Sequence, residues 1–153
     1  MEPHNFKSID LFAGIGGIRL GFDIAFGNEI STVFVSEWDE HAQKTYRANF
    51  KDDFIIAGDI TKINENEIPA FDICLAGFPC QPFSNAGNRK GVNDANGRGT
   101  LFVECERILK SKIEAGVPPM AFVFENVRGI MSSKMDTGIS VPEEIRNRME
   151  TLG

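Results

Sequence analysis

The residues best placed to do chemistry lie at positions 77–84, which read Gly-Phe-Pro-Cys-Gln-Pro-Phe-Ser. The cysteine, Cys80, follows a proline and comes just after residues 71–76, an apolar run with one aspartate that is typical of a buried strand in a parallel sheet. Ligands and reactive groups gather at the carboxyl ends of such strands in open α/β sheets. The segment therefore predicts a thiol nucleophile at a strand end.

A carboxyl group follows another apolar run. Residues 120–125 form an expected strand that ends in Glu125. This strand would bring the carboxyl to the same sheet edge as Cys80, where in its neutral form it could donate a hydrogen bond or a proton. The sequence leaves open the alternative that backbone N–H groups simply satisfy this carboxyl.

A glycine-rich turn, Asp-Leu-Phe-Ala-Gly-Ile-Gly-Gly at residues 10–17, joins the first expected strand to the first expected helix. Glycines allow close backbone approach to a ligand, and a helix start offers free N–H groups. A dinucleotide fingerprint would need glycine at position 19, where the chain has Arg19. A neutral or cationic nucleoside fits this turn better, although packing alone also produces such turns.

Two acids strengthen the nucleoside hypothesis. Glu37 follows the second expected strand, where a carboxylate can accept hydrogen bonds from ribose hydroxyls. Asp59 follows the third and is placed to meet an adenine amino group, while Trp38 could offer an apolar face to the base. Each acid alone could be a turn residue or a helix cap, as we expect for Asp39. Together they describe an adenosine pocket on the sheet edge of Cys80.

The elements that must position these groups alternate between short apolar runs and helical patterns, which indicates βαβ units. We expect strands at residues 8–13, 32–36, 54–57, 71–76 and 120–125. We expect helices at residues 17–26, 40–50 and 100–114, and a last helical pattern at 142–153. The predicted fold is α/β, with a mostly parallel, doubly wound sheet in one domain. The long connection at 77–99 is expected to be functional or mobile.

Composition narrows the class of protein. With 153 residues, 42% hydrophobic and 25% charged, the chain fits one ordinary soluble domain. Its three cysteines lack Cys-x-x-Cys spacing and it has only two histidines, so we expect neither a disulfide framework nor a metal site. We find no membrane span or signal peptide pattern and expect a cytoplasmic location.

Charge is distributed unevenly along the chain. The net charge of −6 argues mildly against a surface covered by nucleic-acid contacts, which need clustered Lys and Arg. Residues 85–112, however, carry six basic side chains against three acidic ones, so a basic loop follows the cysteine directly. Scattered charges on a solvated loop and helix are the alternative interpretation.

Taken together, these motifs resemble the DNA (cytosine-5) methyltransferases, in the same order and with similar spacing. The resemblance extends from about Lys7 to Val127 and is weaker to Leu152. The motifs that carry it are residues 10–17, Glu37-Trp38, Gly58-Asp59-Ile60, residues 77–84, residues 98–102 and Glu125-Asn126-Val127. The implied fold is the Rossmann-like fold of S-adenosylmethionine-dependent methyltransferases, truncated after the fifth strand and the helix that follows it.

The resemblance also implies site residues and a reaction. Cys80 would add to carbon 6 of a flipped-out cytosine, Glu125 would bind at nitrogen 3, and carbon 5 would take the methyl group. The S-adenosylmethionine pocket would be lined by Phe12, Gly14, Gly16, Gly17, Glu37, Trp38, Asp59, Ile60, Gly77 and Leu101. The duplex DNA would be contacted by Gln81, Ser84, Arg89, Lys90 and Arg98.

The chain departs from the family after Glu125. It lacks the family's later glutamine-and-arginine segment, its target-recognition domain and its C-terminal segments, so residues 1–153 would be the N-terminal part of a catalytic domain. The fifth strand would then be an unpaired, apolar sheet edge. We favour the catalytic part of a longer or split enzyme, whose remainder is a second polypeptide or has been removed.

Two other interpretations remain. One is an inactive nucleoside-binding or regulatory fragment of such an enzyme. The other is a Rossmann oxidoreductase or a thiol enzyme of another class, against which Arg19 and the absence of Cys-x-x-Cys both count.

Overall fold

A computed structural model describes residues 5–79, 101–135 and 138–153 of the chain. The strands are β1 (Phe6–Leu11), β2 (Ile30–Ser36), β3 (Ile73–Ala76) and β4 (Ala121–Phe124). The α-helices are α1 (Gly17–Phe26), α2 (Glu40–Asn49), α3 (Leu101–Glu114) and α4 (Val141–Glu150). Short 3-10 helices cover Gly27–Glu29, Ile60–Lys62, Glu65–Glu67 and Arg128–Ser132. None of the helices described is long and apolar enough to cross a membrane.

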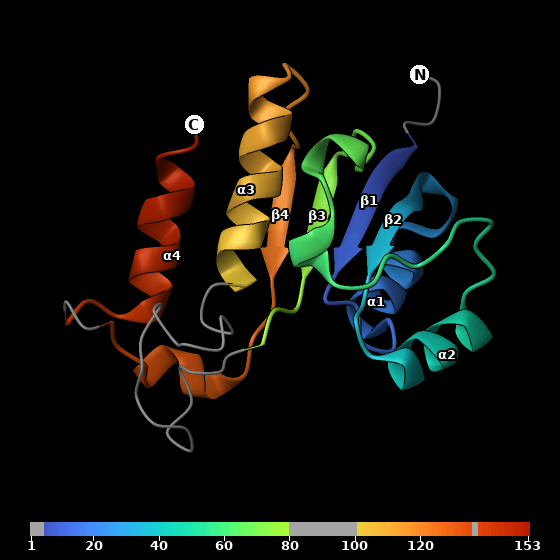
Figure 1. The fold of residues 1–153 in the computed structure, drawn as a ribbon, viewed down its shortest axis with the longest axis horizontal. Coiled ribbons are helices and arrows are strands. Elements are labelled where there is room, and N and C mark those ends of the chain that lie inside the picture. Colours follow the sequence, from blue (N-terminus) through green and yellow to red (C-terminus); the bar gives the residue numbers. More distant parts are fainter. Residues whose placement is uncertain (1–4, 80–100, 136–137) are drawn as a thin grey trace.

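The described strands form one parallel sheet in the order β2-β1-β3-β4 (Figure 1). Because all four run the same way, the residues that follow them meet at one edge of the sheet. The chain begins in the middle of the sheet, adds β2 on one side and then crosses to β3 on the other. This arrangement confirms the predicted α/β class with a parallel, doubly wound sheet.

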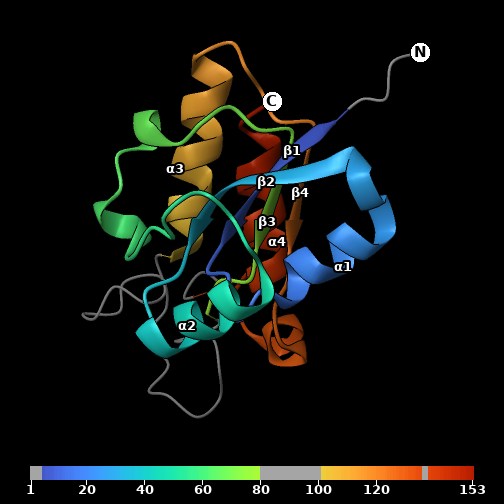
Figure 2. The same ribbon diagram turned by 90° about the vertical axis from the view of Figure 1, so that its right-hand side faces the viewer.

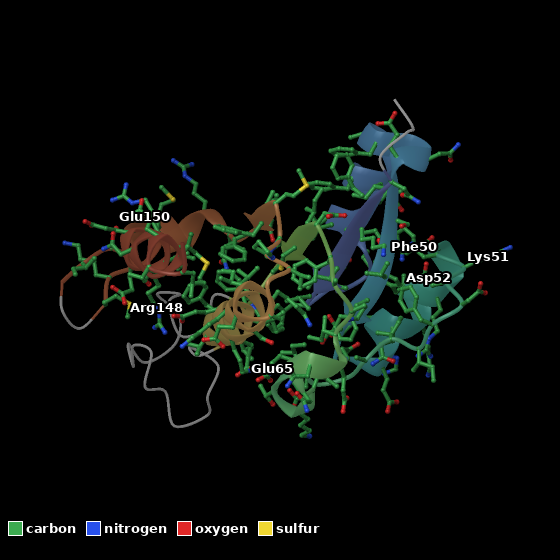
Figure 3. The ribbon with its side chains drawn as sticks, turned by 90° about the horizontal axis from the view of Figure 1, so that it is seen from above. Phe50, Lys51, Asp52, Glu65, Arg148 and Glu150 are labelled. Atoms are coloured by element: carbon green, nitrogen blue, oxygen red, sulfur yellow. The ribbon has the colours of Figure 1, made fainter. Side chains whose placement is uncertain are left out.

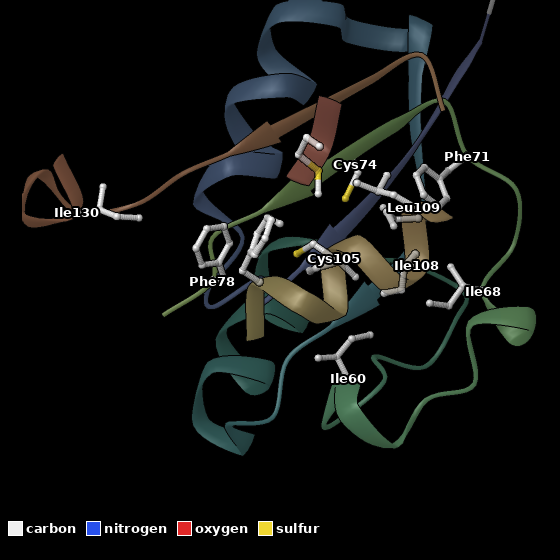
Figure 4. Close-up of a cluster of buried hydrophobic side chains, with 14 of the residues drawn as sticks. Ile60, Ile68, Phe71, Cys74, Phe78, Cys105, Ile108, Leu109 and Ile130 are labelled. Atoms are coloured by element: carbon white, nitrogen blue, oxygen red, sulfur yellow. The ribbon is translucent and has the colours of Figure 1, made fainter. Parts of the chain in front are cut away.

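Helices cover both faces of the sheet (Figure 2). Alternate residues of β1 point to opposite faces, so Ile9 and Leu11 pack in the cluster that includes α3 and α4. On the other face, Leu75 packs with Ile18 and other apolar residues of α1. The larger cluster, drawn in Figure 4, runs from the carboxyl end of β3 along α3.

The helices begin and end largely where the sequence predicts. Asp39 caps α2 by accepting a hydrogen bond from the Ala42 amide at 2.7 Å. Ser140 caps α4, and its hydroxyl accepts from the Glu143 amide. Helix α1 instead starts after Gly16, which has φ +88° and offers no side-chain cap, so the amides of its first turn keep no side-chain acceptor.

The predicted strand at residues 54–57 is wrong. Of this segment, only Ala57 pairs with the sheet, through an isolated parallel bridge to Ser36, the last residue of β2. The reason lies just before this segment, where Asp52 forms an ion pair with Arg19 of α1 and so fixes the chain beside that helix. Ile56 still fills a buried cluster with Val35, which explains why the apolar run looks like a strand in the sequence.

Strand β4 forms one edge of the described sheet, as the sequence predicts for its last strand. Phe122 is 46% exposed and Val123 is 37% exposed, and Met120 just before the strand is also exposed. A cavity of about 380 Å³ lies beside this edge, lined by Leu109, Ile113, Pro118, Pro119, Met120, Phe122, Met149, Leu152 and Gly153.

Candidate cofactor and catalytic site

The glycine-rich turn lies at the carboxyl end of β1 with an unusual backbone. Phe12, Gly14 and Gly16 all have positive φ angles, of 55°, 54° and 88°. The Ala13 amide donates to the Ser36 carbonyl at 3.1 Å, which ties the turn to the end of β2. The uncapped amides at the start of α1 therefore lie beside this edge, where a ligand could accept hydrogen bonds from them.

Glu37 is held against this turn. The residue is 7% exposed, and its Oε2 accepts a hydrogen bond from the Gly14 amide at 2.7 Å. Its Oε1 accepts from the Asp39 amide at 2.8 Å. The Glu37 carbonyl also accepts from Gln43 Nε2 at 2.6 Å. Each carboxylate oxygen has a second lone pair, so the group can still accept hydrogen bonds from two hydroxyls of a ligand.

Asp59 and its neighbours occupy the next position along the edge. Asp59 Oδ1 accepts from the Thr61 hydroxyl at 2.7 Å and from the Thr61 amide at 3.1 Å. The hydroxyl bond is the main reason why the pKa of Asp59 is lowered, with Lys62 adding to it. Trp38 is 78% exposed, whereas Ile60 is 3% exposed and belongs to the core. The Ile60 carbonyl accepts hydrogen bonds from Arg107 Nη2 at 3.1 Å and from the Ile63 amide at 3.2 Å.

Phe12, Gly77 and Glu125 come together at the ends of three strands. The Gly77 amide donates to the Leu11 carbonyl at 3.3 Å, and the Glu125 amide donates to the Ala76 carbonyl at 3.0 Å. A Cβ placed on Gly77 would lie 3.5 Å from Glu125 Oε2 and 3.9 Å from the Phe12 carbonyl oxygen. The nearest neighbour of such a Cβ would be Ile18 Cδ1 at 3.3 Å, and the Glu125 side chain beside it is exposed.

Asn126 holds the segment that leads to Cys80, a role that the sequence did not suggest. Its Nδ2 donates to the Phe78 carbonyl at 2.8 Å, and its Oδ1 accepts from the Val127 amide at 3.0 Å. The Phe78 ring is 3% exposed and packs against the rings of Phe102 and Phe124. The chain is therefore anchored from both backbone and side chain two residues before the cysteine.

Several predicted site residues lie outside the described residues, namely Cys80, Gln81, Ser84, Arg89, Lys90 and Arg98. Of the other predicted residues, Gly17 is the first residue of α1 and is exposed. Leu101 is the first residue of α3, half-buried against the core.

The other two cysteines can be assigned to the core. Cys74 and Cys105 have no exposed surface, and burial raises the pKa of each thiol well above its ordinary value. Figure 4 shows both inside the cluster between β3 and α3. Because the thiolate is the nucleophilic form, neither is suited to attack a ligand at the sheet edge.

A buried acid lies beneath the glycine-rich turn. Asp10 is 1% exposed, and neither of its carboxylate oxygens has a hydrogen-bond partner within the described residues. Burial raises the pKa of Asp10 to about 7, the Arg19 guanidinium opposes this effect, and Glu37 and Asp23 add to it.

Comparison with known proteins identifies the family to which this chain belongs. A family model described as C-5 cytosine-specific DNA methylase matches residues 6–153. The Type II methyltransferase M.SsoII of Shigella sonnei is 47% identical over 151 residues, which are 99% of this chain and 36% of that protein. The Type II methyltransferase M.NlaX of Neisseria lactamica is 54% identical over 123 residues, which are 80% of this chain and 36% of that protein.

The fold has solved relatives as well. The Entamoeba histolytica methyltransferase EhMeth matches with a TM-score of 0.71 and 25% identity, covering 96% of this chain and 44% of that one. The chain thus spans between 36% and 44% of the length of these relatives. A family match along nearly the whole chain confirms the resemblance: the chain belongs to the C-5 cytosine-specific DNA methylases and has their Rossmann-like α/β fold.

Proposed function

We propose that this chain binds S-adenosylmethionine at the described sheet edge and is the catalytic part of an enzyme that methylates carbon 5 of cytosine in duplex DNA. The observation that carries the proposal is the hydrogen bond from Gly14 to Glu37, which joins a turn open to a ligand to an acid able to bind ribose. Gly77 and Glu125 lie at the same edge, so the reacting groups would meet the cofactor there.

The residues present fit this cofactor. Glu37 would accept hydrogen bonds from the ribose hydroxyls, and Asp59 from the adenine amino group. The exposed ring of Trp38 would cover one face of the base, and the amides at the start of α1 would face the polar part of the ligand. When bound, S-adenosylmethionine supplies the methyl group.

The chain's own residues would prepare the cytosine. The thiolate of Cys80 adds to carbon 6, which moves electron density toward nitrogen 3 and carbon 5. Glu125 binds at nitrogen 3 and stabilises the charge that develops there. Loss of the proton from carbon 5 after methylation then expels the Cys80 thiolate and restores the aromatic ring. Burial of the other two cysteines supports giving this role to Cys80.

The target base must leave the duplex for this chemistry, because carbon 6 is stacked inside it. We infer that Gln81, Ser84, Arg89, Lys90 and Arg98 contact the DNA around the flipped cytosine. The remaining recognition surface would come from the rest of a longer protein or from a second polypeptide. We infer that the chain acts on DNA in the cytoplasm.

A second candidate is an inactive nucleoside-binding or regulatory fragment of such an enzyme. It is favoured by the share of the relatives that the chain covers, which is 36% for M.SsoII. The two candidates agree on cofactor binding and differ on turnover, so each needs its own measurement.

Calorimetric titration tests the shared part. We expect S-adenosylmethionine to bind and NAD not to bind, and Glu37→Gln to weaken cofactor binding by about tenfold or more, because the amide replaces a charged acceptor. Glu67→Gln is the matched control, since Glu67 is exposed on a 3-10 helix away from the edge. Binding of NAD without S-adenosylmethionine would overturn the proposal.

Turnover needs the complete enzyme. In a longer protein that carries this chain, Cys80→Ser should abolish methylation while cofactor affinity stays within a few-fold. Equal turnover by that variant would exclude Cys80 as the nucleophile. A complete enzyme that binds the cofactor but never methylates DNA would favour the regulatory fragment.

A further inference from the structure

Arg19 is buried although it is an arginine. It is 8% exposed, and its guanidinium makes two parallel hydrogen bonds to Asp52, Nη1 to Oδ2 at 2.5 Å and Nη2 to Oδ1 at 2.7 Å. Nη1 also donates to the Tyr46 hydroxyl at 2.9 Å. These bonds join α1, which carries Arg19, to the last turn of α2 and to the segment after it.

Aromatic rings complete this contact. The Arg19 guanidinium lies 4.2 Å from the centre of the Phe50 ring and 5.5 Å from that of Tyr46. The same two rings pack closely against Gly16 of the turn. A Cβ added to Gly16 would lie 2.3 Å from Phe50 Cε2. Figure 3 shows Phe50 and Asp52 side by side where the chain leaves α2.

The ion pair is geometrically specific. Burial opposes the charge on Arg19, but its bonds to Asp52 and Tyr46 outweigh that effect and raise its pKa further above the ordinary value. Buried ion pairs are often no more stabilising than apolar contacts of the same size, while their bidentate geometry defines orientation strictly. An orienting role therefore explains this arrangement better than stability alone.

Helix α2 is linked to the glycine-rich turn at its start and to α1 at its end. At its start, Glu37 accepts from the Gly14 amide and its carbonyl from Gln43 of α2. At its end, Arg19 holds Asp52 and Tyr46. The position of Glu37 relative to Gly14 thus depends on where α2 is held along its length.

We propose that Arg19 is a positioning residue for the nucleoside half of the cofactor. By holding the end of α2 against the start of α1, it keeps the Glu37 carboxylate on the Gly14 amide, in place for the ribose. The inference rests on the proposed cofactor function. It also gives Arg19 a role where a dinucleotide fingerprint would have glycine.

The test compares Arg19→Lys, Arg19→Met and Asp52→Asn in the 153-residue protein with Arg146→Lys and Arg146→Met. Arg146 is exposed and pairs with Glu150 on α4, so its variants are matched controls far from the turn. Two quantities are measured: affinity for S-adenosylmethionine and adenosine by calorimetry, and hydrogen exchange of the Gly14 amide by NMR without ligand.

We expect the Arg19 variants and Asp52→Asn to weaken binding of both ligands by at least tenfold and to speed Gly14 exchange by a similar factor. Arg146 variants should change either quantity by less than twofold. In the Arg19→Met background, Asp52→Asn should weaken binding by less than twofold more, because the pair acts together.

The outcomes separate this inference from the proposed function. If the unsubstituted chain fails to bind S-adenosylmethionine, the proposed function fails. Hydrogen exchange of the Gly14 amide still tests whether Arg19 keeps the Glu37 carboxylate on that amide. If it binds and Arg19→Lys folds with unchanged affinity and Gly14 exchange, Arg19 is merely structural and the inference is overturned. Should Arg19→Met not fold, Arg19→Lys and Asp52→Asn carry the test.

Discussion

Among the described glycines, Gly16 is the one where an added Cβ would lie closest to its neighbours. At φ +88° an alanine is strained, and its Cβ would meet the Phe50 ring at 2.3 Å. We expect Gly16→Ala to lower the free energy of unfolding by about 3 kcal/mol, from strain and overpacking together. Urea titration measures this change.

Gly14→Ala is the matched control for that prediction. Gly14 also has a positive φ, of 54°, but nothing lies within 4 Å of its added Cβ. Only strain of about 1–2 kcal/mol should remain. Equal losses for the two variants would show that contact with Phe50 is not what makes position 16 sensitive.

Asp10 should make the protein less stable as the pH rises. Its pKa in the folded chain is about 7, above its ordinary value of 3.8, so the folded state keeps a proton that the unfolded chain has lost. The stability contributed by that proton is complete below pH 4 and is lost as the pH rises through 7. The loss is about 1.4 kcal/mol for each pH unit between these values.

Replacing this carboxyl isolates its effect. Asp10→Asn should flatten the fall in stability between pH 4 and 7, measured from urea midpoints, and should be more stable than the unsubstituted chain at pH 8. Asp53→Asn, at an exposed position, is the control and should leave the fall unchanged. A parallel fall in the Asp10 variant would assign the pH dependence to other groups.

At the scale of elements, helices were more predictable than strands. The 3.6-residue pattern of α1 predicted residues 17–26, the bounds that the structure has. The strand expected at 54–57 failed, because four apolar residues suit either a strand or a buried loop. An ion pair from Asp52 to a distant arginine decided between them, and no local pattern contains that information.

The candidate site also has features that the sequence predicts and features that it does not. Strand ends and acids could be predicted from the sequence because a parallel sheet brings such positions to one edge. The hydrogen bonds of Gly14 to Glu37 and of Asn126 to Phe78 could not, since each joins segments whose packing depends on the whole fold. Both involve residues within motifs that the sequence already singled out.

Strand β4 should make the chain self-associate. Its apolar residues are exposed at an edge whose backbone groups can pair with another strand. Val123→Lys should weaken association by about tenfold in sedimentation experiments, because a charge on the edge opposes pairing. Val117→Lys changes an exposed valine outside the sheet and should have little effect. If both variants weakened association equally, the added charge would act by raising solubility in general and not by blocking strand pairing.

At the scale of the whole molecule, we expect this chain to keep cofactor binding without efficient DNA methylation. The cofactor would meet groups that four short strands bring together, whereas specific DNA recognition needs an interface of about 1,000 Å² or more. The chain carries a net charge of −6 and covers 36% of M.SsoII. Its charge opposes the phosphate contacts that hold DNA.

The purified 153-residue protein should therefore bind S-adenosylmethionine yet transfer little or no methyl to duplex DNA. Tritiated cofactor measures transfer, and calorimetry of the same sample confirms that the pocket is formed. We expect transfer to rise when a polypeptide that carries the part of M.SsoII unmatched by this chain is added, and the rise would show that this part supplies a DNA-binding surface. Robust, sequence-specific methylation by the chain alone would show that the described sheet edge and the segment around Cys80 suffice to select and hold the cytosine.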